Sequence, residues 1–166
     1  SIFDLNISNS SLKKFLLHFF GERFMKIHHV GYLVNNIDDA VADFQKLGYV
    51  VSSSLIFDEK RKIFIQFLEF NPTNTIKNEI VSGGTRIELI TPAQGCELFS
   101  KRLKSLGSIP YHICYECQDF KEKILELQAE GFLLIREPQV APAIENRQVA
   151  FMYSNSIGLI ELLEIK

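Results

Sequence analysis

Runs of apolar residues with two different spacings divide the first half of this chain into short strands and one helix. Strand-like runs are rich in β-branched, aromatic and aliphatic residues, whereas the helical stretch repeats its apolar residues every three to four positions. Pro92 ends the last of these strands. We predict the order strand, helix, strand, strand, strand over residues 27–34, 37–47, 49–57, 62–70 and 85–91.

The second half of the chain repeats the same order of elements. Its predicted strand, helix, strand, strand and strand cover residues 110–117, 119–130, 132–136, 147–153 and 159–165. A loop containing Pro138 and Pro142 separates the second and third of these strands. A helix at about residues 95–106, closed by Gly107, is predicted to link the two halves.

The two halves also match residue by residue. Superposing them sets His29 on His112 and, nineteen residues later in each copy, Gly48 on Gly131. The same alignment places Glu88 on Glu161, although the first copy carries about ten extra residues between its histidine and its glutamate. An internal duplication determines the architecture before any single element is considered. Each copy is therefore a βαβββ module.

A four-stranded sheet with one helix has one covered and one uncovered face. Two such sheets can turn their uncovered faces toward each other. We therefore expect an α+β fold in which two βαβββ modules form a half-open barrel around a cleft. The predicted domain spans residues 25–166, with module one at 26–92, a linker helix at 93–108 and module two at 109–166. The polar run at 71–84 is where the extra residues of copy one are expected.

Residues 1–24 belong to neither copy. Their apolar residues fall on one stripe of an amphipathic helix that ends at Gly21. We predict an N-terminal helical extension that packs on the domain or on a second subunit, with the tail of an upstream domain as the alternative. The apolar run is too short, and too broken by His18, to be the core of a signal peptide.

The repeat brings one histidine and one glutamate of each copy toward the predicted cleft. Two neutral imidazoles and two carboxylates balance a divalent cation and leave two adjacent positions of an octahedral ion for a bidentate substrate. A single strand histidine is more often a core or surface group, but two glutamates within apolar strands favour a metal site, because an unpaired buried carboxylate is costly. The predicted ligands are His29, Glu88, His112 and Glu161. His28 competes with His29, and the repeat register favours His29.

Three other polar residues are candidates for substrate contacts. Arg86 and Glu116 share the predicted cleft face, where they act as a substrate anchor and a proton-transfer group or pair with each other; we favour the pairing. Gln66, in the predicted strand at 62–70, is the third. The basic clusters at 59–62 and 101–104 are read as solvated surface, with an anchor for a phosphorylated substrate as the alternative.

Composition narrows the classes of protein that remain. A chain of 166 residues fits one domain, and its net charge of −2 argues against a nucleic-acid partner. Three cysteines argue against a disulfide framework and favour the cytoplasm. Cys114 and Cys117 have C-x-x-C spacing, but on a strand they point to opposite faces, so we interpret both as core residues. No apolar run is long enough for a membrane span.

Four motifs in this order resemble the vicinal oxygen chelate (glyoxalase/bleomycin resistance) superfamily, and most of all its methylmalonyl-CoA epimerase branch. The resemblance covers about residues 26–165, and lactoylglutathione lyase (glyoxalase I) is a neighbouring branch. The motifs are His29–Val34, Ile87–Pro92, Tyr111–Glu116 and Gly158–Leu163.

The resemblance implies one divalent metal ion, whether cobalt, nickel, manganese, zinc or magnesium, held by the four predicted ligands. It also implies removal of a proton next to a carbonyl, with Glu88 and Glu161 moving the proton and the metal stabilising the charge that develops. The substrate is expected to be a small molecule, such as a CoA or glutathione thioester or a hemithioacetal. A homodimer is the oligomeric state that we consider for this chain.

Several functions remain open at this point. The leading one is a metal-dependent epimerase or isomerase; lactoylglutathione lyase is the second, and a metal-free small-ligand-binding or resistance protein is the third. Retention of all four ligand types counts against the third. A ring-cleaving dioxygenase is expected to use only three ligands, so Glu88 counts against it. An epimerase also needs a base outside the ligand set, for which the strand at 62–70 offers Gln66 and Glu69.

Overall fold

A single curved sheet forms the centre of the protein. The computed structural model describes residues 25–71 and 84–166, and in this part of the chain the strand order is β2-β4-β5-β1-β6-β9-β8-β7, with β3 paired to β4. The strands of the first half are β1 (Lys26–Leu33), β2 (Tyr49–Val51), β3 (Ile56–Asp58), β4 (Ile63–Phe70) and β5 (Arg86–Pro92). Those of the second half are β6 (Ile109–Cys117), β7 (Leu133–Ala141), β8 (Arg147–Ser154) and β9 (Gly158–Glu164).

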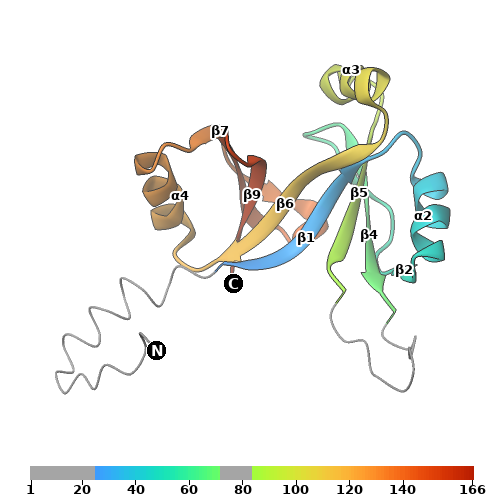
Figure 1. Cartoon of the computed structure of the whole chain (residues 1–166), viewed down its shortest axis with the longest axis horizontal. Helices are drawn as coiled ribbons and strands as arrows, with labels where there is room; N and C mark the ends of the chain where they lie inside the picture. The colour runs from blue at the N-terminus through green and yellow to red at the C-terminus, as the bar shows by residue number, and fades with distance from the viewer. Residues whose placement is uncertain (1–24, 72–83) are drawn as a thin grey trace.

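The sheet consists of two modules with the same topology. In each module the first strand lies parallel to the last, β1 beside β5 and β6 beside β9. The modules join where β1 and β6 run antiparallel through the middle of the molecule (Figure 1). The predicted α+β fold with an open, half-barrel arrangement of two βαβββ modules is confirmed. Its predicted N-terminal helix and most of the 71–84 insertion lie outside the described residues.

Three α-helices flank this sheet in the described residues: α2 (Ile37–Lys46), α3 (Glu97–Leu106) and α4 (Phe120–Ala129). The side chain of Asn36 accepts a hydrogen bond from the Asp39 amide and caps α2, as expected for asparagine at this position. Helix α3 is the predicted linker, and it ends at Gly107, which adopts a positive φ of 71°. Figure 1 shows α2 and α4 on opposite flanks of the molecule.

Three apolar clusters show which face of the sheet each helix covers. One cluster joins α2 to the outer face of β4 and β5, and a second joins α4 to the outer face of β8 and β9. The third contains residues from both modules, including Ile65, Leu33, Val149 and Leu163. Because side chains alternate across a strand, this third cluster marks the opposite, inner face of the curved sheet.

Two predicted strands differ from those observed. The strand predicted at 49–57 is two short strands, because Ser53 between them turns to the neighbouring β4, where its hydroxyl accepts a hydrogen bond from the Phe67 amide. The strand predicted to end at 136 continues to Ala141 as β7, with irregular pairing to β8. Pro138 is tolerated within it because β7 lies at the edge of the sheet, where an amide donor is dispensable.

The cysteine prediction is confirmed. Cys114 and Cys117 are free thiols, buried in two different clusters on opposite faces of β6. Among the described residues, no helix combines the length and apolar character that crossing a membrane requires. The cytoplasmic location and the domain boundaries stay predictions.

Candidate metal centre

The four predicted ligands meet on the inner face of the curved sheet, where the two modules join. Each comes from a different strand, β1, β5, β6 or β9, and each module supplies one histidine and one glutamate. The cross-strand register explains the convergence: Gly31 of β1 pairs with both His112 and Glu88, and Cys114 of β6 pairs with both His29 and Glu161. All four side chains are buried.

The ligand atoms lie at distances that a metal ion requires. The Nε2 atom of His29 is 3.2 Å from one carboxylate oxygen of Glu88 and 3.2 Å from one of Glu161. The Nε2 atom of His112 is 3.4 Å and 3.2 Å from the same two oxygens. The two Nε2 atoms are 3.1 Å apart. Ligands at 2.0–2.1 Å from a cation and at right angles to each other are about 3 Å apart, so the four residues fit a divalent ion.

One carboxylate oxygen supports the same conclusion. Oε2 of Glu161 is buried and accepts no hydrogen bond of good geometry, although two imidazole nitrogens lie within 3.2 Å of it. A buried carboxylate oxygen normally accepts hydrogen bonds, because its desolvation is otherwise uncompensated. A buried carboxylate oxygen that faces two imidazole nitrogens in this way is typical of a ligand set.

Small residues make room for the histidine rings. A Cβ atom at Gly31 would overlap the imidazole of His112, its cross-strand partner. The matching place in the other module, opposite His29, holds the small residue Cys114. In both modules, therefore, a small residue lies opposite the histidine and leaves room for its ring.

Aromatic rings hold the imidazoles at their edges. Phe67 of β4 contacts His29 with ring centroids 5.4 Å apart, and Phe151 of β8 contacts His112 at the same 5.4 Å. Phe67 and Phe151 are equivalent in the repeat, since each pairs with the glutamate of its own module. Both imidazoles are thus fixed by the same packing.

The electrostatics of the four residues are strongly coupled. Burial alone would lower the pKa of His112, but the carboxylates of Glu161 and Glu88 outweigh it and raise that pKa to about 9. Burial would raise the pKa of Glu88, but His29 and His112 hold it at about 2. The pKa of His29 is raised and that of Glu161 is lowered for the same reasons. Without a cation, the cluster keeps its carboxylates ionised by holding protons on the imidazoles.

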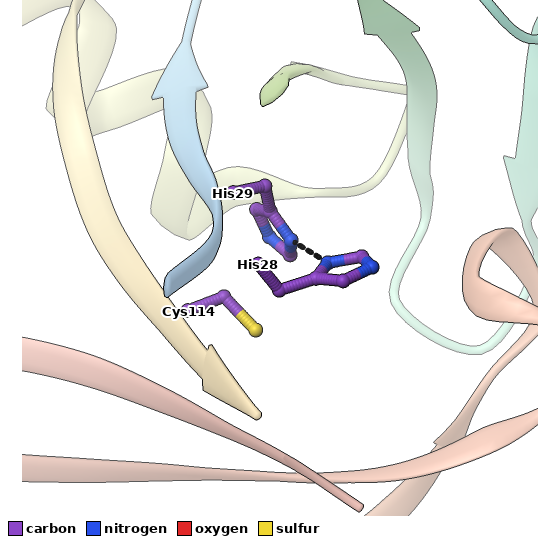
Figure 2. A group of neighbouring side chains, drawn as sticks. All are labelled: His28, His29 and Cys114. Carbon is purple, nitrogen blue, oxygen red and sulfur yellow. Dashed lines mark hydrogen bonds between the residues drawn. The ribbon is translucent and has the colours of Figure 1, made fainter. Parts of the chain in front are cut away.

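His28 lies beside the site rather than within it. A bulge between Ile27 and His29 breaks the alternation of β1 and brings the neighbouring imidazoles together, with their Nδ1 atoms 2.8 Å apart (Figure 2). Burial, followed by the proximity of His29, lowers the pKa of His28 to about 4. His28 is therefore neutral and can accept a hydrogen bond from Nδ1 of His29 while Nε2 of His29 faces the cluster.

His28, His29 and Cys114 form a second group whose donor atoms are close enough to hold a metal (Figure 2). Burial raises the pKa of the Cys114 thiol well above its ordinary value, so it stays protonated, whereas the thiolate is the form that binds metals. The two Nδ1 atoms are engaged with each other. The group of two histidines and two glutamates is the better ligand set.

The other predicted site residues are placed differently. The pairing favoured between Arg86 and Glu116 is wrong: Glu116 pairs with Arg147 at 2.8 Å, and Arg86 lies 3.5 Å from Glu69 and over the Phe67 ring. These ion-pair partners depend on the register between neighbouring strands, which the alternation of side chains within one strand does not predict.

Gln66 points away from the cleft. Its amide donates to the Ser53 carbonyl, and the residues of β4 that face the cleft are Ile63, Ile65 and Phe67. Glu69 is more than half exposed. The strand that was expected to supply a base outside the ligand set therefore presents an apolar surface to the cluster.

A cavity of about 480 Å³ opens beside the cluster, between the two modules. Glu88, His112 and Glu161 are among its lining residues. Tyr111 also lines it, because a second bulge, next to His112 in β6, breaks the alternation of that strand. Tyr111 was not predicted as a site residue, and the repeat alignment that sets it on His28 is the signal that could have identified it.

Comparisons with known proteins agree with this architecture. The family model described as "Glyoxalase/Bleomycin resistance protein/Dioxygenase superfamily" matches residues 28–151. Among curated protein sequences, none matches the chain significantly.

Solved structures match over most of the chain. A hypothetical protein from Bacillus halodurans is 24% identical, with a TM-score of 0.71, covering 87% of this chain and 96% of its own. Methylmalonyl-CoA epimerase from Mycobacterium tuberculosis is 19% identical, with a TM-score of 0.67 and coverage of 84% and 87%. A Streptomyces coelicolor methylmalonyl-CoA epimerase in complex with 2-nitronate-propionyl-CoA is 19% identical, with a TM-score of 0.67 and coverage of 84% and 96%. At these identities the likeness establishes the fold.

Proposed function

Because the chain belongs to the glyoxalase/bleomycin resistance/dioxygenase superfamily, we propose that it is a divalent-metal-dependent epimerase or isomerase. The reaction removes a proton from a carbon next to a carbonyl, in a substrate that presents two oxygens to the metal. The observation that carries the proposal is that one ligand atom from each of His29, Glu88, His112 and Glu161 lies within 4.8 Å of the others. Three of these residues also line a cavity large enough for a substrate.

A divalent cation bound at these residues supplies a Lewis acid that polarises the carbonyl and makes the neighbouring carbon more acidic. The protein supplies the rest. Glu88 and Glu161 line the cavity, so their carboxylates can reach a substrate proton as well as hold the ion. The two phenylalanines and Gly31 keep both imidazoles in place. Apolar walls limit the access of water to the reacting carbon.

The proposal is tested by measuring metal content and proton exchange together. Purified protein, loaded with cobalt or nickel, is incubated with methylmalonyl-CoA in deuterium oxide, and incorporation at the acidic carbon is followed by mass spectrometry. We expect exchange that depends on the metal and is lost in His112→Ala. Metal binding without exchange on methylmalonyl-CoA or on a hemithioacetal would exclude both classes of compound as substrates. Absence of metal binding would instead favour a protein that binds a small ligand without transforming it.

One observation favours a second candidate, lactoylglutathione lyase. A two-base epimerisation needs a proton-transfer group on each face of the substrate, and the inward side chains of β4 are apolar. The buried carboxylates that line the cavity are Glu88 and Glu161; the others lining it, Glu97 and Glu137, are exposed. A proton shift between adjacent carbons needs only one base, and a ligand carboxylate can serve.

Glu88→Gln and Glu161→Gln test which ligand carboxylate acts as the base. Glutamine keeps an oxygen for the metal but cannot accept a proton. If Glu88 is the base, the variant should bind metal and lose at least about a hundredfold in turnover, which is the usual contribution of a positioned base. If Glu88 only holds the ion, turnover should change little, while Glu161→Gln should remove it. Turnover unchanged in both variants would exclude both carboxylates as the base.

A further inference from the structure

The residues that line the cavity beside the metal cluster indicate which class of substrate fits there. Its volume of about 480 Å³ is room for on the order of fifteen water molecules, far more than the two chelating oxygens need. It also lies within the ordinary size range of small-molecule sites, about 300–1,000 Å³. A substantial part of the ligand must therefore occupy space beyond the metal.

The walls of this cavity are apolar. Ile63 and Ile65 of β4 face it from the first module, and Val149 and Phe151 of β8 face it from the second. Ile90, Ala141 and Ile144 extend the same surface, and all three are buried. Tyr111 is the aromatic residue of the wall that carries a hydroxyl group, and it packs edge-on against Phe99 at 5.2 Å.

Outside the metal cluster, the charged residues that line the cavity are exposed, except Arg61, whose guanidinium is paired with the buried carboxylate of Asp58. The exposed ones are Lys60, Lys62, Glu97, Arg136 and Glu137. A ligand segment inside the cavity would therefore meet few hydrogen-bonding partners between the metal cluster and the rim. A chain containing amides or hydroxyls would lose its water there without compensation, whereas an aliphatic or aromatic group would be stabilised by burial.

Among the described residues, two polar side chains pack near His29. There His28 is bonded to His29, and Arg86 lies over the Phe67 ring, 4.2 Å from its centroid. His29 itself does not line the cavity, although its equivalent His112 does. This cavity thus reaches the cluster at Glu88, His112 and Glu161, next to apolar wall residues.

We propose that the substrate of this site carries a bulky apolar acyl or aryl group directly beside its two chelating oxygens, and that this group fills the cavity between β4 and β8. The inference rests on the proposed function, since the chelating oxygens need the metal, and it narrows the substrate class. Methylmalonyl-CoA, whose group at this position is a single methyl, should therefore exchange its proton more slowly than an analogue with a larger apolar group.

Hydroxamates of graded tail length test this directly, because they present two oxygens to a metal and need no knowledge of the reaction. The cobalt-loaded protein is titrated calorimetrically with acetohydroxamate, hexanohydroxamate and benzohydroxamate. A fourth probe, 3-acetamidopropanohydroxamate, has nearly the length of hexanohydroxamate but carries an amide in its tail. Burial of each methylene should strengthen binding about three- to fourfold, so hexanohydroxamate should bind at least about tenfold tighter than both acetohydroxamate and the amide probe.

Two variants assign any such gain to the cavity. Ala143→Phe adds a ring at a lining position in the 3₁₀ helix η2 (Pro142–Ile144) and should remove the advantage of the long tails while leaving acetohydroxamate binding intact. Ala129→Phe, the same change on the exposed end of α4, is the matched control and should alter neither.

Equal affinity for short, long and amide-bearing tails would overturn the inference, as would an undiminished tail effect in Ala143→Phe. Both outcomes leave the metal site standing, since acetohydroxamate still binds. Failure of every hydroxamate, acetohydroxamate included, would instead overturn the proposed function and the inference with it.

Discussion

The imidazole of His29 is held from both ends. Its Nε2 atom faces the cluster, and its Nδ1 atom lies 2.8 Å from Nδ1 of the neutral His28. Histidines that bind metals generally donate their second ring N–H to such a partner, which fixes the ring and strengthens its basicity. His112 differs, since its Nδ1 is buried with no hydrogen-bond partner among the described residues.

His28→Phe should therefore weaken metal binding by about 10- to 100-fold, the usual effect of losing a partner of this kind. The measurement is cobalt affinity by competition with a chelator. His28→Asn, which keeps an acceptor, should recover most of the affinity. Tyr111→Phe is the control, because it removes only a hydroxyl at the equivalent position of the other module. An affinity in His28→Phe equal to wild type would show that His28 does not orient His29.

Gly31 is required by the ring that lies against it. A Cβ atom there would overlap His112, so Gly31→Ala should displace that imidazole. We expect at least a tenfold loss of metal affinity, because the ring cannot shift and still reach the cluster. Cys114→Ala, at the matching position opposite His29, should leave the affinity near wild type. This control also tests the group of His28, His29 and Cys114, since loss of metal binding in Cys114→Ala would assign the metal to that group.

The raised pKa of His112, about 9, makes metal binding depend on pH. A metal binds the neutral imidazole, so at pH 7.5 binding should release at least about one proton per ion. A pH indicator in weak buffer measures this. The affinity should rise with pH up to about 9 and then level off. Binding without proton release would contradict the charge state assigned to the metal-free cluster.

The same group affects the stability of the metal-free protein. Because the pKa of His112 is higher in the folded state than its ordinary 6.5, its stabilising contribution is complete below about pH 6.5. That contribution is lost as the pH rises through about 9. Urea unfolding of the metal-free protein should therefore show lower stability at pH 9 than at pH 6.5.

Arg147 connects three strands of the second module, β6, β8 and β9. Its guanidinium, from the start of β8, lies 2.8 Å from Glu116 of β6 and donates to the Glu164 carbonyl of β9 at 2.7 Å. Arg147→Met should lower the free energy of unfolding by about 1–3 kcal/mol, because it leaves Glu116 partly buried without its partner. Metal affinity should not change.

Lys101→Met is the control for this change. Lys101 pairs with Glu97 on the exposed face of α3, where an ion pair contributes little, so its loss should be within about 0.5 kcal/mol. If Arg147→Met is as stable as Lys101→Met but loses metal or ligand binding, Glu116 and Arg147 belong to the site rather than to the framework.

Most elements were predictable because the repeat constrains them twice. The helices and the strands that carry the ligands appear where apolar periodicity places them, and the alignment that pairs Gly48 with Gly131 is matched by positive φ angles of 94° and 95°. The break after Val51 and the continuation of β7 past Pro138 were not predictable. Both depend on which strand lies alongside, and local pattern does not contain that information.

The candidate site was predictable in its ligands but not in its surroundings. The ligands are buried polar residues in apolar strands, which is an unusual pattern that the repeat doubles. Alternation of side chains alone would place His28 on the face of β1 opposite His29, and Tyr111 on the face of β6 opposite His112. In the structure a bulge in each strand brings these side chains next to the site. The partners of Arg86 and Glu116 likewise depend on register across the sheet.

At the scale of the whole molecule, the two modules share one candidate metal centre. Each module supplies half of the donor atoms, and the atoms meet only because β1 and β6 pair in the register observed. Neither module alone therefore has the donor atoms to hold the ion. A ligand lost from either module should have the same consequence.

Metal stoichiometry and affinity in wild type, His29→Ala and His112→Ala test this claim most directly, with thermal unfolding of each metal-free protein as the check on folding. We expect one tight divalent ion per chain in wild type and loss of that site in both variants, each of which stays folded. A folded variant of either kind that still binds one ion as tightly as wild type would show that one module suffices, and it would contradict the shared centre.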